Sequence, residues 1–588
     1  MFLYRLLYPE PPPVEIMEEV RKRTPVPLSF ELIRQTEIFI EETLYPQAFS
    51  LLLDVLASGN VCSETGTVAS TPVVIPQPQH LAIAATMLVH PFTTTRAKLD
   101  AEKEAPNIAL RLLRLTNSLV GPTAAQFHTA FAFTHFETTR RGTRRANSPA
   151  LNEPLTEEKK KAWEASYSGG RSLWNEAEDF WHAVGWAFNC SVLHPAQWKH
   201  WHLWLQFMCQ VLEDDWADRE QQYGEAQEKE TQQRSDREAS IIDHPEPATD
   251  KGRGGRPRKS DKVKQKDGLE IFRDSLLYQY VMSDNTYGRN RRIMRAIFAD
   301  GQPKSAEFRS VFEDEIKAPR RKKVGSNLRK RAGVDLSKGE YGDYQNDSDD
   351  EYASLKESRA SPTPGQNRLL RAPKRIRQTR NSKDTATDSE SEASDIVADH
   401  ENGIASIGGY NALALRQRLL GLLSKFSVTL PKDFLPMDDI YHMFAENIRD
   451  LPLPVFQHMV TPSNLQGLEP EAHSSLCEMI FFVMRESSAP TSEDDFLTAA
   501  KLETCFLPYM AASPTAANNA KISILLEAMM ALLYNEKMLS ATPGLVKAAR
   551  TGIERRQDAC RGDSNTMAAA YLRESSFRIQ FMVDSILP

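Results

Sequence analysis

The chain has 588 residues, which is too long for a single hydrophobic core. At about one domain per 150 residues, this length predicts two to four structural units. Hydrophobic residues make up 41% of the chain and charged residues 26%, a balance that indicates packed domains diluted by polar linker. The net charge of −7 excludes a general attraction to nucleic acid, so any affinity for DNA must come from a local cluster of cations.

The cysteines and the apolar segments indicate a soluble intracellular protein. Six cysteines lie far apart, without the dense spacing of disulfide-rich secreted modules. The apolar start from Met1 to Leu7 is interrupted by Arg5 and closed by Pro9, so it is too short for a signal peptide. No uninterrupted apolar run approaches the roughly 18 residues that span a bilayer, and we expect no membrane contact.

The first part of the chain, from about residue 29 to residue 136, has apolar residues at helical spacing. Two stripes are clear: Phe49, Leu52, Leu53 and Leu56, then Ile108, Leu112, Leu115 and Leu119. No alternating run is long enough to predict a sheet. The predicted fold class is therefore all-α.

All eight tryptophans fall within residues 163–216. The spacing predicts one helix that begins after Ser172 and has Trp181 on its apolar face, and a second that begins at Pro195 and ends near Trp216. The second helix is apolar over so wide an arc that it must be almost engulfed. We therefore predict a packed aromatic core or a partner groove. A platform that stacks on single-stranded nucleic acid would need more nearby cations.

Residues 217–267 lack apolar periodicity, which predicts a disordered basic loop. Periodicity returns at residues 269–282, 291–298 and 308–316, and this predicts helices that complete the N-terminal domain. An insertion of this length is tolerated because the entropy of loop closure rises slowly with length. The expected N-terminal domain therefore consists of residues 1–216 and 268–316.

The rest of the chain is expected to form a disordered linker, residues 317–403, and a C-terminal helical domain, residues 404–588. The linker alternates basic and acidic blocks. In the C-terminal domain, apolar stripes that begin at Leu415 and Ile522 predict helices, and frequent prolines divide the domain into short ones. No fixed repeat period is present, and a solenoid of stacked helices stays open as an alternative.

The basic loop contains a recognisable motif. Between Lys251 and Lys266 it has eight lysines and arginines against one acidic residue, Asp261. Within this stretch the string Gly252-Arg253-Gly254-Gly255-Arg256-Pro257-Arg258-Lys259 resembles an AT-hook, a short peptide motif that binds the minor groove of A·T-rich DNA. The resemblance covers fewer than ten residues.

The physics of a narrow minor groove explains the motif, because such a groove concentrates negative potential and admits an extended peptide. Glycine permits close approach, and Pro257 favours an extended backbone at Arg256. The string departs from the usual core at Gly254, where a second arginine is expected. The resemblance implies these DNA-binding residues: Arg253, Gly255, Arg256, Pro257, Arg258 and Lys259. A solvated basic linker or a nuclear-import signal is the alternative.

The linker holds two further basic clusters. Residues 317–331 carry eight lysines and arginines and residues 368–383 carry seven, with no acidic residue in either. Runs in both clusters are typical of nuclear-localisation signals: Arg320, Arg321, Lys322 and Lys323, then Lys374, Arg375 and Arg377. We therefore expect the protein to reside in the nucleus.

Acidic blocks in the same linker surround four serines, Ser348, Ser389, Ser391 and Ser394, and are typical of sites for acidophilic kinases. Phosphates there would compete with DNA for the neighbouring cations and act as a charge switch. The alternative is an acidic tract that only increases solubility.

Two groups of residues could hold a metal, and neither has the right spacing. The soft ligands are Cys190, His194, His200, His202 and Cys209, and two histidines that are two positions apart on one helix point to different faces. The acidic residues Glu213, Asp214, Asp215 and Asp218 are expected to form a solvated helix end. Phosphate-binding loops and hydrolase signatures are not found in the sequence. We predict no metal and no cofactor.

These observations favour a non-catalytic, chromatin-associated scaffold or complex subunit. Its basic segments would bind DNA weakly, with a preference for A·T-rich duplex and a strong dependence on salt, and its helical domains would bind nuclear proteins. One alternative is a transcription regulator, although no compact sequence-reading motif is readable. The other is a helical enzyme with a site near the tryptophan-rich helices, which would need convergent polar residues in a pocket.

Overall fold

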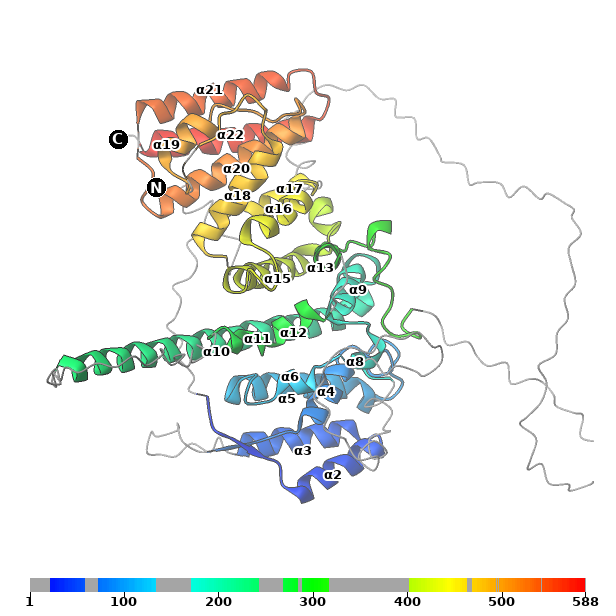
Figure 1. The fold of residues 1–588 in the computed structure, drawn as a ribbon. Helices are drawn as coiled ribbons and strands as arrows, with labels where there is room; N and C mark the ends of the chain where they lie inside the picture. Colours follow the sequence, from blue (N-terminus) through cyan, green and yellow to red (C-terminus); the bar gives the residue numbers. More distant parts are fainter. Residues whose placement is uncertain are drawn as a thin grey trace, which may run out of the picture. The chain divides into compact units, whose positions relative to one another are not determined.

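The computed structural model of the chain describes residues 22–58, 72–133, 171–242, 268–283, 288–316, 401–462, 468–492, 494, 496–540 and 542–586. In this part of the chain the regular structure is helical, and the predicted all-α class is confirmed (Figure 1). The strands described are two segments of three residues each, β1 (Pro25–Pro27) and β2 (Val73–Ile75), which pair in parallel. Their apolar runs are too short for a periodicity argument to detect.

The first helices pack on one another near the N-terminus. They are α2 (Phe30–Glu41), α3 (Tyr45–Ser58), α4 (Pro78–Met87), α5 (Asp100–Val120) and α6 (Phe127–Ala130). The two predicted apolar stripes lie on α3 and α5, and these helices pack against each other with Phe49 and Leu112 fully buried. The sequence pattern therefore identified the first layer correctly.

The tryptophan-rich segment forms three helices: α8 (Leu173–Glu176), α9 (Phe180–Leu193) and α10 (Pro195–Ile242). The prediction of a single helix after Ser172 is wrong, because the chain is extended at Ala177 and α9 starts anew at Asp179. The Asp179 carboxylate accepts a hydrogen bond from the backbone N–H of His182 and so caps α9. The predicted aromatic core is confirmed, with Trp181 and Trp216 buried.

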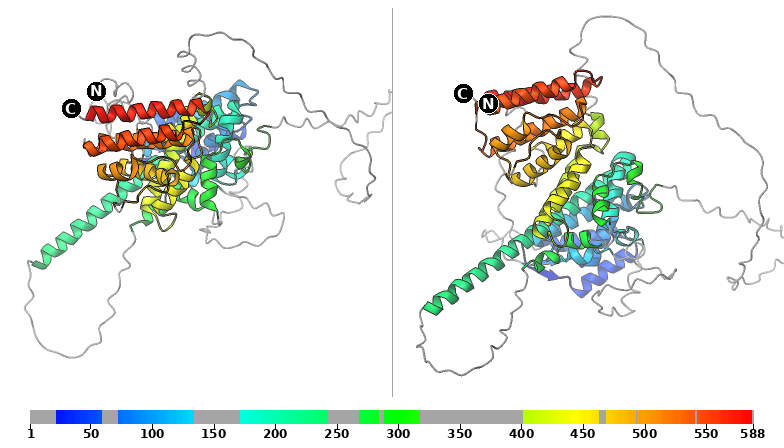
Figure 2. Two further views of the ribbon diagram at one scale, coloured as in Figure 1. Left: turned by 90° about the horizontal axis from the view of Figure 1, so that it is seen from above. Right: turned by 45° about the horizontal axis from the view of Figure 1, so that its top comes forward.

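Helix α10 continues far beyond Trp216, so the prediction of a disordered loop is wrong for residues 217–242. Arg219 lies just past this point and donates hydrogen bonds to the carbonyl oxygens of Ile271 and Asp274, which fixes the helix to the returning chain. Beyond Tyr223 the helix projects away from the packed helices (Figures 1 and 2). Its Glu, Gln, Lys and Arg residues have high helix propensity, so a helix needs no apolar stripe there.

The helices after the excursion are α11 (Glu270–Arg273), α12 (Leu276–Met282) and α13 (Arg289–Ile297). Helices were predicted at residues 269–282 and 291–298, and these helices pack on α9 and α10. A helix was also expected at residues 308–316, and this prediction is wrong: a short 3-10 turn, η1 (Pro303–Ser305), is followed by non-helical turns. Side chains of α9 bind the carbonyl groups of Ser305, Phe308 and Arg309, in place of a helical hydrogen-bond ladder.

The C-terminal part is helical, as predicted, and regular structure resumes at residue 401. Its elements are α15 (Gly409–Thr429), α16 (Met437–Ile448), α17 (Leu453–Val460), α18 (Pro470–Met484), α19 (Ala499–Lys501), the π-helical turn η2 (Leu502–Phe506), α20 (Ala516–Asn535), α21 (Pro543–Ala559) and α22 (Thr566–Ile586). Prolines stand at the starts of several of these helices, since the first turn has no intrahelical donor to lose.

One described helix, α20, is long and apolar enough to cross a membrane by length and composition alone. However, 89% of its most apolar window is buried inside the protein, where α18, α21 and α22 pack around it. A central core helix has this composition, so the apolar character of α20 is explained by packing.

The helices on either side of residues 317–400 form one compact unit, a point that the sequence left open. Helix α10 packs on α15, α13 packs on α16, and α9 also touches α15. Figure 1 shows these elements as a continuous stack of helices from α2 to α22. The junction between the two parts therefore lies along α10 and α15.

Candidate functional site

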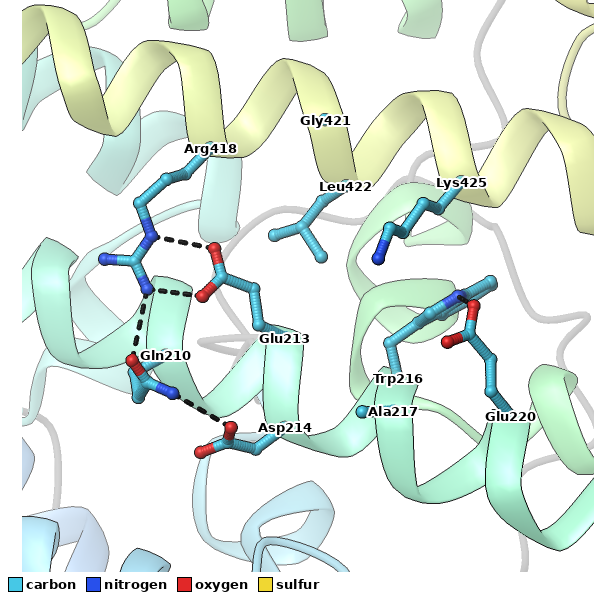
Figure 3. Close-up of a pocket in the computed structure, with 10 residues that line it drawn as sticks. All are labelled: Gln210, Glu213, Asp214, Trp216, Ala217, Glu220, Arg418, Gly421, Leu422 and Lys425. Carbon is cyan, nitrogen blue, oxygen red and sulfur yellow. Dashed lines mark hydrogen bonds and ion pairs between the residues drawn. The ribbon is translucent and has the colours of Figure 1, made fainter. Parts of the chain in front are cut away.

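The candidate site is a pocket of about 340 Å³ between α10 and α15, shown in Figure 3. This volume is at the lower end of the range for sites that bind small molecules or single side chains. The lining residues are Gln210, Glu213, Asp214, Trp216, Ala217 and Glu220 from α10, and Arg418, Gly421, Leu422 and Lys425 from α15.

The helical period explains why these residues share a pocket. On α10 the residues recur every three or four positions from Gln210 to Glu220, and on α15 they do so from Arg418 to Lys425. Residues at this spacing lie on one face of a helix. The two faces oppose each other where the helices pack, so the pocket is built from two regular surfaces and not from loops.

An ion pair closes one end of the pocket. Arg418 Nε lies 2.7 Å from Glu213 Oε1, and Arg418 Nη2 lies 2.5 Å from Glu213 Oε2. This two-point pairing is the strongest geometry available to a guanidinium and a carboxylate. Burial lowers the pKa of Arg418, but the hydrogen bonds to Glu213 and the nearby charges of Glu213 and Asp214 together outweigh burial and raise the pKa above its usual value.

The ion pair continues into a hydrogen-bond chain that reaches α5. Arg418 Nη2 also lies 3.4 Å from Gln210 Oε1, and Gln210 Nε2 donates to Asp214 Oδ1 at 2.9 Å (Figure 3). The Asn117 amide of α5 donates to the other oxygen of Asp214. Each carboxylate at this end of the pocket therefore accepts hydrogen bonds from side chains of the protein.

The other end of the pocket has an aromatic floor. The Trp216 side chain is 1% exposed, and its indole N–H donates to Glu220 Oε1 at 2.9 Å. Lys425 and Glu220 both point toward this indole (Figure 3). Within the described residues the Lys425 ammonium has no hydrogen-bond or ion-pair partner, so it offers its donors to whatever enters the pocket.

The chemistry of the lining is set by an aromatic floor, carboxylates and two cations. The ten residues include no serine, threonine, cysteine or histidine, so the pocket offers none of these nucleophiles and no imidazole base. Its carboxylates accept hydrogen bonds from neighbouring side chains. An apolar floor beside an available ammonium suits an apolar side chain that has a hydrogen-bond acceptor next to it.

The four acidic residues predicted to form a solvated helix end lie instead in the middle of α10 and have separate partners. Glu213 pairs with Arg418 and Asp214 accepts from Asn117. Buried Asp215 pairs with Arg219 and accepts from the backbone N–H of Leu276, while Asp218 pairs with Lys22. The prediction was wrong because the helix continues past them, and their separation explains why they do not form one cation site.

Of the soft ligands that the sequence brings together, Cys190 and Cys209 are buried in the aromatic core, whereas His194, His200 and His202 are half-buried. Burial raises the pKa of the Cys190 thiol, and raises that of Cys209 to about 12. Burial also lowers the pKa of each histidine of the group: His194, His200 and His202. In the part of the chain that the structure describes, no group of three or more His, Cys, Asp or Glu side chains is placed to hold a metal ion.

The residues predicted to bind DNA lie outside the described part of the chain. They are Arg253, Gly255, Arg256, Pro257, Arg258 and Lys259. The nuclear-localisation and phosphorylation candidates also lie outside it: Arg320, Arg321, Lys322, Lys323, Lys374, Arg375 and Arg377, and Ser348, Ser389, Ser391 and Ser394. These assignments stay predictions.

Known protein families, curated protein sequences and solved structures yield no match to this chain. The site is therefore interpreted from its own residues. Sequence reasoning weighed Glu213 and Asp214 but missed Arg418 and Lys425, because 205 positions separate Arg418 from Glu213. No local pattern indicates which helix face meets another at such a separation.

Proposed function

We propose that the protein is a non-catalytic nuclear scaffold that binds DNA through its basic segments and binds other proteins through its helical body. The observation that carries this proposal is the separation of charge along the chain. The basic clusters at residues 251–266, 317–331 and 368–383 hold 8, 8 and 7 of the 72 lysines and arginines, and one of the 79 acidic residues. The rest of the chain therefore has 49 lysines and arginines against 78 acidic residues.

This separation has a direct electrostatic consequence. DNA is a dense line of negative charge, and a protein binds it by releasing counterions wherever its cations neutralise phosphates. The acidic remainder repels DNA, so binding would be confined to the clusters. The AT-hook-like string with Arg256 at its centre supports a preference for A·T-rich minor grooves within that general attraction.

The helical body supports the protein-binding half of the proposal. Three of its arginines stabilise the packing from inside. Arg416 and Arg556 are fully buried and donate hydrogen bonds to backbone carbonyl groups, and Arg578 forms an ion pair with Glu527. The α10–α15 pocket has an apolar floor and the available ammonium of Lys425, features of a surface that accepts a partner side chain.

The DNA half is tested by titrating the full chain into labelled duplexes of equal length, one A·T-rich and one G·C-rich, over a range of salt concentrations. We expect tighter binding to the A·T-rich duplex and a log–log salt slope of about −0.9 for each phosphate neutralised. Arg256→Ala with Arg258→Ala should reduce the A·T preference. The matched control is Arg375→Ala with Arg377→Ala, which removes the same charge and should weaken both duplexes equally.

Equal affinity of the unaltered chain for the two duplexes at fixed salt would remove the minor-groove part of the proposal and leave attraction by charge. A chain that binds neither duplex at low salt would remove DNA binding as a whole. Nuclear residence is checked separately, by imaging a fluorescent fusion in which alanine replaces the cations of both candidate signals: Arg320, Arg321, Lys322 and Lys323, and Lys374, Arg375 and Arg377. We expect the altered fusion to lose nuclear enrichment.

A further inference from the structure

Residues 303–316, named here the strap, cross α9 and α10 and form no α-helix or strand after the 3-10 turn η1. The strap nevertheless buries its inward-facing side chains: Phe308, Val311, Phe312 and Glu315 are each at most 4% exposed. The surface beneath it, named here the strap groove, consists of α9, the first half of α10 and the turn at residues 90–96. The strap lies at the point where the described chain stops before residues 317–400.

The groove binds the strap backbone through side chains. The Asn189 amide nitrogen donates to the carbonyl oxygens of Ser305 at 3.1 Å and of Phe308 at 2.9 Å, while its oxygen accepts from the backbone N–H of Gly301 at 2.9 Å. Asn189 is 4% exposed, so all three bonds form away from water. One buried amide thus binds two backbone groups of the strap and one just before it, and these contacts do not depend on the strap side chains.

A histidine extends this backbone recognition. His182 Nδ1 accepts the backbone N–H of Glu178 at 3.1 Å, so the ring proton is on Nε2, which donates to the carbonyl oxygen of Arg309 at 3.0 Å. Burial lowers the pKa of His182, consistent with a neutral ring. At the far end of the strap, Gln197 Nε2 lies 3.4 Å from the carbonyl oxygen of Glu315.

Two side-chain anchors complete the fit. The Phe308 ring sits on Gly185, where a Cβ atom would lie 2.3 Å from the ring, so only glycine leaves room for it. The Glu315 carboxylate is held between two indoles: Trp201 Nε1 donates to Oε1 at 2.6 Å and Trp186 Nε1 to Oε2 at 3.0 Å. Between these anchors Phe312 packs edge-on against His90, with ring centroids 4.8 Å apart.

No backbone-to-backbone hydrogen bond joins the strap to the helices beneath it in the described part of the chain. There, the strap's backbone-to-backbone hydrogen bonds join residues 302–315 to one another, as from Phe308 N to Ser305 O and from Glu315 N to Phe312 O. Its links to the groove are made by side chains. The groove therefore holds the strap backbone through side chains and receives Phe308, Phe312 and Glu315 as anchors.

We propose that the strap groove is a peptide-binding groove that the chain fills with its own strap. The partner that fits it is a peptide that adopts the turns of the strap, with two aromatic residues four positions apart and an acidic residue three positions after the second, the spacing of Phe308, Phe312 and Glu315. The strap then acts as an internal ligand that such a partner displaces. This inference rests on the proposed role of the helical body as a protein-binding scaffold.

The test uses the full chain and a fluorescein-labelled synthetic peptide with the sequence of residues 303–316. The unaltered chain should bind the peptide poorly, because its groove is full. The variant Phe308→Ala with Phe312→Ala weakens the strap and leaves the groove intact, so it should bind at least tenfold more tightly by fluorescence anisotropy. A control peptide with alanine at the same two positions should bind this variant at least tenfold more weakly than the first peptide.

A folded variant that shows no saturable binding, or that binds both peptides equally, would overturn the proposal. If the variant does not fold, hydrogen exchange of the unaltered chain decides the question. Strap amides should then exchange at least tenfold faster than α9 amides, and equal rates would show that the strap is an inseparable part of the core. Neither assay contains DNA, so failure here leaves the DNA-binding proposal standing.

Discussion

The guanidinium of Arg416 stacks on the ring of Phe188, with its central carbon 3.9 Å from the ring centroid. Arg416 belongs to α15 and Phe188 to α9, so this contact joins the two helical parts that flank residues 317–400. The same guanidinium donates to the carbonyl oxygens of Ile297, Ala299 and Ile407. It therefore fastens the end of α13 to the start of the C-terminal part.

Replacing Arg416 with methionine should destabilise the protein by about 3 kcal/mol, because buried carbonyl groups lose their donors and the stacked cation is lost. Arg416→Lys keeps the charge but loses the planar guanidinium, so its stability should lie between those of the unaltered chain and the methionine variant. The measurement is the midpoint of denaturation by urea for the three proteins. A methionine variant as stable as the unaltered chain would contradict the role of Arg416 as a fastener.

Glu315 should make stability depend on pH. Burial raises the pKa of Glu315 to about 7, against the opposing hydrogen bonds from Trp201 and Trp186. The folded protein keeps this proton up to about pH 7, whereas the unfolded chain releases it near pH 4.5. Stability from this group is thus fully present below pH 4.5 and falls as the pH rises to about 7, by about 3 kcal/mol in total.

Glu315→Gln isolates this contribution, because glutamine has the same shape and does not titrate. Buried histidines act in the opposite direction: burial lowers the pKa of His80, His90 and His473 to about 4, so their contribution is lost as the pH falls from 6.5 toward 4. Denaturation midpoints of both proteins between pH 4.5 and 8 give the difference. If the difference does not change with pH, Glu315 does not titrate in this range.

The sequence predicted the fold class because helical periodicity is a local property. The apolar stripes on α3, α5, α15 and α20 could be read directly, and so could the buried tryptophans. The end of α10 could not be predicted from periodicity, because the polar residues beyond Trp216 have high helix propensity but form no apolar stripe. The strap was read as a helix because its apolar residues have helical spacing, whereas Asn189 and His182 bind its backbone.

The candidate pocket was only half visible in the sequence. Glu213 and Asp214 stood out as a cluster of acidic residues, but the direction of each side chain depends on neighbours more than 90 positions away, Arg418 and Asn117. Long-range pairing of this kind follows from helix packing and not from local pattern. The binding of Glu315 by Trp186 and Trp201 could not be predicted for the same reason, because these residues are also far apart in the sequence.

The ion pair between Arg418 and Glu213 should be measurable in a double-mutant cycle. The two side chains are 23% and 34% exposed, so solvent weakens their attraction, and we expect a coupling energy of about 1 kcal/mol. The cycle uses Arg418→Met, Glu213→Gln and the double variant, compared by thermal midpoint. The coupling should decrease when salt is raised to about 1 M, where the screening length is near 3 Å. A coupling of zero at low salt would show that the pair does not hold the junction.

Two glycine substitutions should have opposite effects on stability although the chemical change is identical. In Gly185→Ala the new methyl group would lie 2.3 Å from the Phe308 ring, and we expect a loss of about 2 kcal/mol from crowding in the core. In Gly224→Ala the methyl group meets nothing within 4 Å, and alanine should stabilise the projecting part of α10 by about 1 kcal/mol. Circular dichroism follows helix content, and thermal midpoints follow stability.

The crowding argument also predicts how the Gly185 substitution combines with removal of the ring. Phe308→Ala alone should destabilise the protein by about 3 kcal/mol or more, because it leaves a cavity over Gly185. Once the ring is gone the methyl group at position 185 has room, so Gly185→Ala with Phe308→Ala should be no less stable than Phe308→Ala alone. If the two losses instead add, the damage from Gly185→Ala arises within α9 and not at its contact with the strap.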